Sequence, residues 1–238
     1  RLWLDDFAEF MAIKEHFGNQ ALQKWDDKKA VARDPKTLEK YRTMLADQIQ
    51  YFKVTQYFFF KQWSDLKHYA NQKGIKIIGD MPIYVAADSV EVWTKPELFQ
   101  LDKERNPLFV AGVPADQFSA TGQLWGNPLY DWEEHKKQGY AWWIHRIEES
   151  FKIYDVLRID HFKGFSDYWQ VDGKADIAKY GSWQPGPGYD LFKAVKEQLG
   201  DLPIIAEDLG NIDDKARKLL ADCHYPGMKI LQFGFEDI

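Results

Sequence analysis

A single cysteine, no long apolar run and scattered basic residues narrow the classes to which this 238-residue chain can belong. With Cys223 alone, no intrachain disulfide can form, which fits a reducing compartment. No apolar run approaches the roughly 20 residues that a membrane-spanning helix requires, so we expect no membrane partner. The 31 Lys and Arg residues form no block and the net charge is −6, so we expect no nucleic-acid partner.

Signals for common cofactors and for export are missing as well. Cys223 and the scattered histidines show no zinc-ligand spacing, and no glycine-rich loop is placed to hold a phosphate. We therefore expect neither a metal nor another cofactor. The chain opens at Arg1 with no initiator Met and no signal peptide, so we expect a cytoplasmic protein whose beginning is missing.

Aromatic residues, by contrast, are abundant. The chain holds 10 Trp, 12 Tyr and 16 Phe, and flat rings suit the apolar faces of sugars. They suit ordinary protein cores equally well, and packing is the more frequent cause of such an excess. Aromatic content alone therefore does not identify a ligand.

The hydrophobic pattern alternates between helices and strands. Helices are expected over residues 4–16, about 35–71, 131–152, 189–199 and 213–223, and strands over 75–80, 156–160, 203–207 and 228–233. Residues 94–131 are rich in Pro, Gly and Asn and predict an irregular insertion. A second Gly- and Pro-rich loop is expected after residue 160.

This alternation predicts an α/β fold with parallel strands and right-handed crossovers. About four central strands do not close a barrel, and an open four-stranded sheet would leave two bare edges. We therefore expect residues 1–238 to be an incomplete catalytic (β/α)8 TIM barrel, with residues 94–131 as an insertion that holds an active-site loop. The alternative is a complete, small doubly wound sheet, which no glycine-rich loop supports.

Two of the expected strands end on a carboxylate, Asp160 and Glu207. The chain between them has room for a loop, a helix and the next strand, so both should emerge at the carboxyl edge of neighbouring parallel strands. Enzymes that cleave and re-form glycosidic bonds need two such groups. One attacks the anomeric carbon and the other moves a proton to and from the bridging oxygen.

The residues around the two carboxylates predict different roles for them. Arg158 and Asp160 share one face of their strand, and the guanidinium should keep Asp160 ionised. Glu207 follows three apolar residues, and partial desolvation should raise its pKa so that it can act as a general acid. His161 and Asp208 should point away from the site unless the strands end there. The alternative for Arg158 and Asp160 is a structural ion pair in a barrel interior.

Five segments resemble those of the 4-alpha-glucanotransferases, also called amylomaltases or disproportionating enzymes. Arg158-Ile159-Asp160-His161-Phe162 is similar to the nucleophile motif of that family, and Ile205-Ala206-Glu207-Asp208-Leu209-Gly210 to its acid/base motif. The remaining resemblances lie in Ile77–Val85, Asp88–Trp93 and the loop Phe118–Tyr130. The order and the intervals agree with the family pattern, and the resemblance covers nearly the whole chain.

The resemblance implies a retaining double displacement on malto-oligosaccharides and other alpha-1,4-glucans. Asp160 would be the nucleophile that forms a covalent glucosyl intermediate, and Glu207 would be the acid/base. Arg158 would hold Asp160 and touch the sugar in the cleavage subsite. Pro114 to Gln123 is the candidate lid, which would favour transfer by excluding water.

Further substrate-binding residues follow from the same resemblance. Asp80 would bind sugar hydroxyls, Trp125 would stack on a glucose ring, Asn127 would support that loop, and His161 would contact the acceptor side. The alternatives are a core position for Trp125 and a strand-end cap for Asp80. The family's third carboxylate lies beyond Ile238, so we expect the isolated 238-residue chain to be inactive and poorly soluble.

Three other functions remain open at the level of the sequence. An alpha-amylase-like retaining hydrolase uses the same two carboxylates. A non-catalytic glucan-binding protein would use only the aromatic loop. A metal-dependent barrel enzyme would gather Asp160, His161, Glu207 and Asp208 as ligands.

Overall fold

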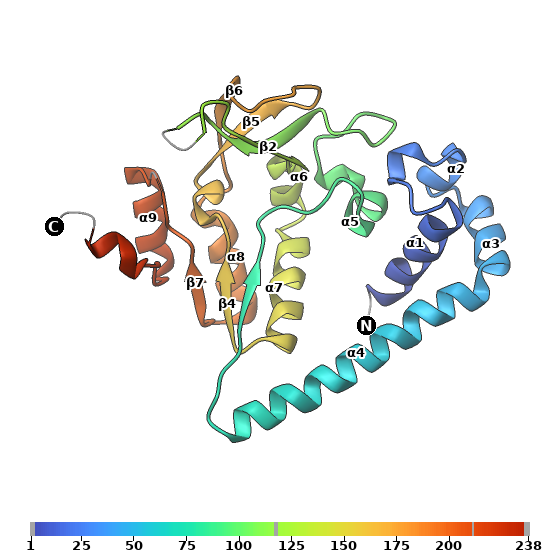
Figure 1. Cartoon of the computed structure of the whole chain (residues 1–238), viewed down its shortest axis with the longest axis horizontal. Helices are drawn as coiled ribbons and strands as arrows, with labels where there is room; N and C mark the ends of the chain where they lie inside the picture. The colour runs from blue at the N-terminus through green and yellow to red at the C-terminus, as the bar shows by residue number, and fades with distance from the viewer. Residues whose placement is uncertain (1–2, 117–118, 211, 236–238) are drawn as a thin grey trace.

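The computed structural model describes residues 3–116, 119–210 and 212–235 of the chain. A parallel sheet lies at the centre, an antiparallel sheet lies beyond the carboxyl ends of its strands, and helices α1 to α4 form a group to one side (Figure 1). Helix α7 packs against the parallel sheet, and α8 packs against α7. The result is a mixed α/β arrangement, as the alternating pattern predicts.

The parallel sheet confirms three of the four expected strands. It consists of β1 (Ile78–Met81), β4 (Val156–Ile159) and β7 (Ile204–Ala206), in the order β1-β4-β7. Asp80 lies opposite Arg158 in the β1–β4 register, and Ile159 lies opposite Ala206 in the β4–β7 register. The helices between successive strands form the crossover connections that parallel strands need. The carboxyl ends of the three strands therefore lie at the same edge of the sheet.

The expected strand at residues 228–233 is wrong. Residues 228–230 have no regular structure, and Leu231–Phe235 form a 3-10 helix, η4. The Pro226 carbonyl accepts the N–H of Ala206 on β7 at 2.9 Å, but the N–H of Met228 donates to the Asp208 side chain at 2.7 Å. Because the Asp208 carboxylate binds the Met228 N–H, that N–H does not form the next backbone hydrogen bond to β7.

Two long expected helices are each divided. The first is α3 (Pro35–Met44) followed by α4 (Ala46–Gln72), with Leu45 between them. The second is α6 (Trp132–Lys137) followed by α7 (Ala141–Ile153), because Gly139 and Tyr140 both have positive φ, 61° and 57°, which a right-handed helix cannot contain.

The other helices agree with the sequence pattern or are short. Helices α1 (Leu4–His16), α8 (Tyr189–Leu199) and α9 (Asp214–Cys223) confirm the remaining expected helices. The short helical segments are α2 (Lys28–Val31), α5 (Val90–Thr94), η1 (Leu22–Lys24), η2 (Pro96–Leu98) and η3 (Phe162–Phe165).

The insertion is not irregular, which corrects the expectation for residues 94–131. It contributes β2 (Phe109–Val113) and β3 (Gln123–Pro128) to an antiparallel sheet. The loop expected after residue 160 supplies the partners β5 (Asp167–Asp172) and β6 (Gly181–Pro185), in the order β3-β2-β5-β6. A residue of β3, Trp125, contacts His161 just after β4, although the two segments are distant in sequence.

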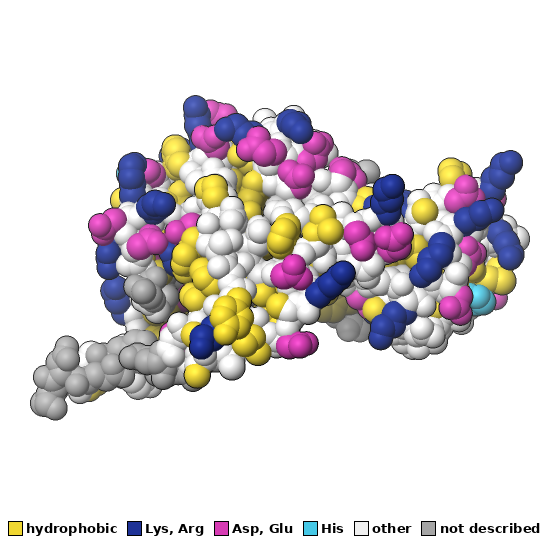
Figure 2. All heavy atoms as spheres, turned by 90° about the horizontal axis from the view of Figure 1, so that it is seen from above, with side chains coloured by type: hydrophobic (Ala, Val, Ile, Leu, Met, Phe, Trp, Pro, Cys, Tyr) yellow, Lys and Arg dark blue, Asp and Glu magenta, His cyan; other side chains and the backbone are white. Residues whose placement is uncertain are grey.

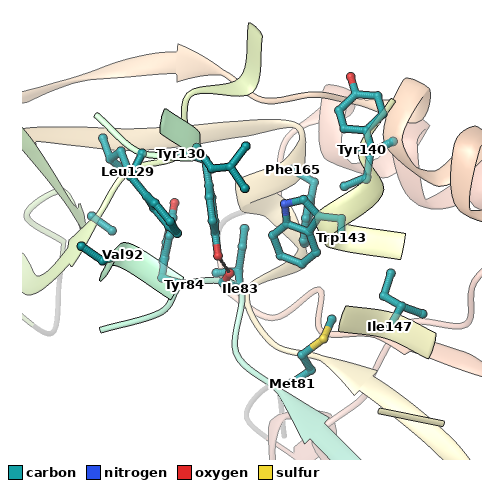
Figure 3. Packing of buried hydrophobic residues seen from close by; sticks show 14 of the residues in the cluster. Met81, Ile83, Tyr84, Val92, Leu129, Tyr130, Tyr140, Trp143, Ile147 and Phe165 are labelled. Atoms are coloured by element: carbon teal, nitrogen blue, oxygen red, sulfur yellow. Dashed lines mark hydrogen bonds between the residues drawn. The ribbon is translucent and has the colours of Figure 1, made fainter. Parts of the chain in front are cut away.

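Aromatic packing fixes the segment that follows β1. Tyr84, Tyr130 and Trp143 are buried together between that segment and α7 (Figure 3). The Tyr130 hydroxyl donates to the Ile83 carbonyl at 2.7 Å, as the dashed line in Figure 3 shows. These three rings belong to the core, and they hold the β1 end in place for the site described below.

The surface carries charges of both signs. Lys and Arg side chains are interspersed with Asp and Glu on the face shown in Figure 2. Helix α4 is long, but neither it nor any other helix in the described ranges has the apolar length that crossing a membrane requires.

Candidate active site

Arg158 joins two carboxylates at the carboxyl edge of the parallel sheet. Its Nη1 lies 2.6 Å from Oδ1 of Asp80 and 2.9 Å from Oδ1 of Asp160. The Arg158 side chain is 22% exposed, whereas Asp80 and Asp160 are 61% and 46% exposed. The guanidinium therefore lies beneath two carboxylates that remain open to a ligand. Burial alone would lower the pKa of Arg158, but the hydrogen bonds to Asp80 and Asp160 outweigh it and raise the pKa.

Glu207 reaches the same edge from β7. Its N–H donates to the Ile159 carbonyl at 3.0 Å. Its carboxylate accepts the N–H of His161 at 3.0 Å through Oε2 and the N–H of Leu209 at 2.8 Å through Oε1. Since His161 directly follows Asp160, the structure brings the Glu207 carboxylate against the backbone that carries the Asp160 side chain.

His161 adopts an unusual backbone conformation next to these carboxylates. Its φ is 50°, in the left-handed region that few non-glycine residues occupy. Desolvation by burial lowers the pKa of His161 to about 4, against an opposing effect of the Asp160 charge. The imidazole is therefore neutral at pH 7, and it can donate or accept one hydrogen bond without adding charge to the site.

Trp125 on β3 faces the same region and is not a core residue. It is 36% exposed, and its ring lies edge-on to the His161 ring with 4.9 Å between centroids. The centre of the Tyr84 ring lies 6.2 Å from the centre of the Trp125 ring. Asn127, two residues further on β3, donates from Nδ2 to the Val85 carbonyl at 2.9 Å. It thereby ties the Trp125 strand to the segment after β1.

Comparison with known proteins identifies the family. The family model described as 4-alpha-glucanotransferase matches residues 1–238. The chain belongs to the 4-alpha-glucanotransferase family. It is 57% identical over 233 residues to a 4-alpha-glucanotransferase of Streptococcus pneumoniae serotype 4, with 98% of this chain and 46% of that protein covered. A 4-alpha-glucanotransferase of Clostridium butyricum is 49% identical over 234 residues, with 98% and 48% covered.

Solved structures of the family agree with the fold. The amylomaltase from Streptococcus agalactiae in complex with acarbose is 64% identical and superimposes with a TM-score of 0.97. The superposition covers 99% of this chain and 48% of that structure. The chain thus spans about half the length of the 4-alpha-glucanotransferases that it matches.

Two residues at the site of this family member escaped the sequence analysis. The Sδ of Met228 lies 3.1 Å from Nε of Arg158, and no sequence signal marks a methionine as a guanidinium contact. Lys163 on η3 lies 2.5 Å from Asp167 and 2.6 Å from Asp213, and its Nζ is 4.6 Å from the centre of the Trp183 ring. These contacts of Lys163 connect β5, β6 and the start of α9 to the segment that follows Asp160.

The Asp208 carboxylate binds the main chain of the segment that follows α9. Its Oδ1 accepts the N–H of Met228 at 2.7 Å. In the described ranges, the only three His, Cys or carboxylate residues with ligand atoms within 4.8 Å of one another are His145, Glu148 and Glu149 on α7. The four ligands of the metal-dependent alternative are therefore not gathered at the site.

The candidate lid and a groove beside α7 lie at different places. In the lid, residues 117–118 fall outside the described residues, and Asp116 accepts the N–H of Ser119 at 2.8 Å in a tight turn. A groove of about 610 Å³ lies between α1, α4, α5 and α7, lined in part by Phe60 and Trp142. Asp80, Asp160 and Glu207 do not line that groove.

Proposed function

We propose that the protein to which this chain belongs transfers alpha-1,4-glucan segments from a donor malto-oligosaccharide to an acceptor glucan. Support comes from the names of its relatives, 4-alpha-glucanotransferases, and from the acarbose complex of the S. agalactiae amylomaltase. The observation that carries the proposal is the convergence of Asp80, Arg158, Asp160 and Glu207 at one sheet edge.

The fold proposal extends the observed sheet. Three adjacent parallel strands with helical crossovers are a recurring part of a (β/α)8 barrel, whose chemistry lies at the carboxyl ends of the strands. We infer that residues 1–238 are an incomplete catalytic barrel of this kind. Residues 94–131 then form the active-site loop region, because β3 brings Trp125 to the carboxyl edge.

The first chemical step forms a covalent intermediate. The Asp160 carboxylate attacks the anomeric carbon while Glu207 donates its proton to the bridging oxygen, and the bond between that carbon and that oxygen breaks. The leaving oligosaccharide departs with a new hydroxyl, and the glucan segment remains as an ester of Asp160. Arg158 holds the Asp160 carboxylate in position for this attack.

The second step releases the segment to an acceptor. Glu207, now a carboxylate, removes the proton of an acceptor hydroxyl, whose oxygen attacks the anomeric carbon and displaces Asp160. Two inversions at one carbon retain the alpha configuration, which requires the two carboxyl groups to lie about 5–5.5 Å apart. Neither step consumes a cofactor.

The neighbouring side chains account for substrate binding. Asp80, exposed and held by Arg158, accepts hydrogen bonds from sugar hydroxyls. Trp125 stacks on a glucose ring, and Asn127 maintains the position of its strand. His161 contacts the acceptor side through a neutral imidazole. Water is excluded by the contacting rings of Trp125, His161 and Tyr84 and by the lid at residues 114–123. The exclusion of water favours transfer over hydrolysis.

Product analysis tests the proposal against the hydrolase alternative. The full-length protein that contains this chain is incubated with maltotriose, and the products are separated by length. Transfer yields glucose plus chains longer than maltotriose, whereas a hydrolase yields only shorter ones. Insensitivity to a chelator is the expected companion result. Cytoplasmic location remains a prediction from the sequence.

A further inference from the structure

The Arg158 guanidinium is held at both ends by different partners. On one side its Nη1 donates to Asp80 and Asp160, at 2.6 Å and 2.9 Å. On the other side its Nε donates to the sulfur of Met228, at 3.1 Å. Because the guanidinium is planar, fixing the Nε–H direction also fixes the directions of the Nη1 hydrogens. The thioether contact therefore contributes to the orientation in which the guanidinium meets the two carboxylates.

Met228 is in turn positioned by Asp208. The segment from Pro226 to Met228 runs beside β7 outside any regular element. Its two anchors are the Pro226 carbonyl, which accepts the N–H of Ala206, and the Met228 N–H, which donates to Oδ1 of Asp208 at 2.7 Å. The carboxylate packs closely on Gly227, where an added Cβ would lie 2.4 Å from Oδ2 of Asp208.

We propose that Asp208 is a positioning residue for the transfer reaction, acting through Met228 on Arg158 and so on Asp160; this rests on the function proposed above. Asp208 directly follows Glu207 in the chain, whereas Arg158 lies on the neighbouring strand β4. One short turn after β7 therefore fixes both the acid/base, through Glu207, and the orientation of the group that holds the nucleophile, through Asp208.

A purely structural role would give different kinetics. If Asp208 only anchored the segment, its loss would lower the amount of folded enzyme and leave kcat per folded molecule unchanged. If Asp208 positions Arg158, its loss disorders Asp160 in the chemical step and lowers kcat, with little effect on ground-state substrate binding. The ratio of the kcat change to the KM change therefore separates the two roles.

The test uses three variants of the full-length protein that contains this chain, with maltotriose as substrate. We expect D208A and M228L each to lower kcat about tenfold while KM changes less than about twofold, the loss expected for one misplaced hydrogen-bonding group. D208N keeps an oxygen that accepts the Met228 N–H and should restore kcat to within about twofold of the wild type. D34A, which removes the carboxylate that accepts the N–H of Thr37 at the start of α3, is the matched control and should leave both constants unchanged.

Gly227 gives an independent route to the same perturbation. Because an Ala Cβ would displace the Asp208 carboxylate, G227A should reproduce the loss of kcat. The double variant G227A/D208A should be no worse than D208A alone, since both changes remove one contact. M228L still tests the proposal where D208A lowers the yield of folded protein, because Leu is apolar and close to Met in volume but lacks the sulfur.

The outcomes separate this inference from the proposed function. Wild-type protein that lengthens no chains would refute the function and the inference with it. Wild-type transfer combined with an unchanged kcat in M228L and G227A would overturn the inference alone. Wild-type transfer with a D208N enzyme as impaired as D208A would also overturn it, because the accepting oxygen would then not be the relevant feature.

Discussion

The Glu207 carboxylate accepts the main-chain N–H of His161, the residue directly after Asp160, at 3.0 Å. A backbone hydrogen bond thus links the two groups to which the chemistry is assigned. The N–H of Glu207 also donates to Ile159, directly before Asp160, so the two strand ends are joined on both sides of Asp160. Their relative position depends on the β4–β7 ladder more than on flexible side-chain packing.

The first prediction concerns the acid/base role of Glu207. E207Q should lower kcat on maltotriose roughly 10²–10⁴-fold, because the leaving oxygen no longer receives a proton. A donor with a fluoride leaving group needs no proton, so its first step should be much less affected. Azide, which attacks without a base, should accelerate turnover of that donor. The measurement is the rate of fluoride release with and without azide.

E197Q is the matched control for this experiment, since Glu197 is 64% exposed on α8. It should behave as the wild type on both donors. An equal loss of activity on maltotriose and on the fluoride donor in E207Q, with no azide effect, would remove Glu207 from acid/base chemistry.

The second prediction separates catalysis from binding at Asp160. D160N should lower kcat at least about a thousandfold, because an amide does not attack the anomeric carbon. Maltotriose affinity, measured by calorimetry, should change only about fivefold, since the amide still accepts from Arg158. D190N on α8 is the control, with a carboxylate that is 58% exposed and paired with Lys136. Retained turnover in D160N would favour a glucan-binding role for this residue.

The third prediction concerns the exposed ring of Trp125. W125A should weaken maltotriose binding about tenfold, because a stacked sugar face loses its aromatic partner, and W125F should recover part of the loss. Y180A is the control, because Tyr180 is an aromatic residue that is 72% exposed before β6. Unchanged affinity in W125A would mean that the ring serves only to pack against His161.

The fourth prediction is a pH dependence of stability that comes from His135. The side chain is 1% exposed, and burial lowers its pKa from 6.5 to about 4. The unfolded chain therefore binds the extra proton first, and stability is lost as the pH falls from about 6.5 toward 4. Between pH 7 and pH 5 this loss is about 2 kcal/mol for one such group.

Urea unfolding at pH 7 and pH 5 measures this loss. In H135F the difference between the two pH values should shrink by about 2 kcal/mol relative to the wild type, since the phenyl ring has no proton to bind. His161, whose pKa is lowered in the same direction, retains its own share of the pH dependence. An identical pH dependence in H135F and the wild type would contradict the assignment to His135.

The sequence predicts the parallel sheet and the carboxylates well because local rules determine them. Asp160 and Glu207 end apolar runs of strand length, and Arg158 shares a strand face with Asp160 through the two-residue period. The contacts of Arg158 with Asp160 and Asp80 follow from that period and from parallel pairing with β1.

The antiparallel sheet and the path after α9 depend on distant contacts, and so they could not be predicted. Strands β5 and β6 lie in a segment whose glycines and prolines indicate a loop, and they become strands by pairing with β2 from the insertion. Residues 228–233 have the composition of a strand, but the Asp208 side chain binds the N–H of Met228 that a ladder would use. Neither effect leaves a periodic signal.

Chemical trapping of the covalent intermediate tests the central claim most directly. A fluorinated glucosyl fluoride, which forms the ester quickly and releases it slowly, is incubated with the full-length protein, and the digested peptides are sequenced by mass spectrometry. The account predicts one added fluorinated glucosyl group, attached to Asp160. A label on any other residue of a protein that turns over maltotriose would contradict it.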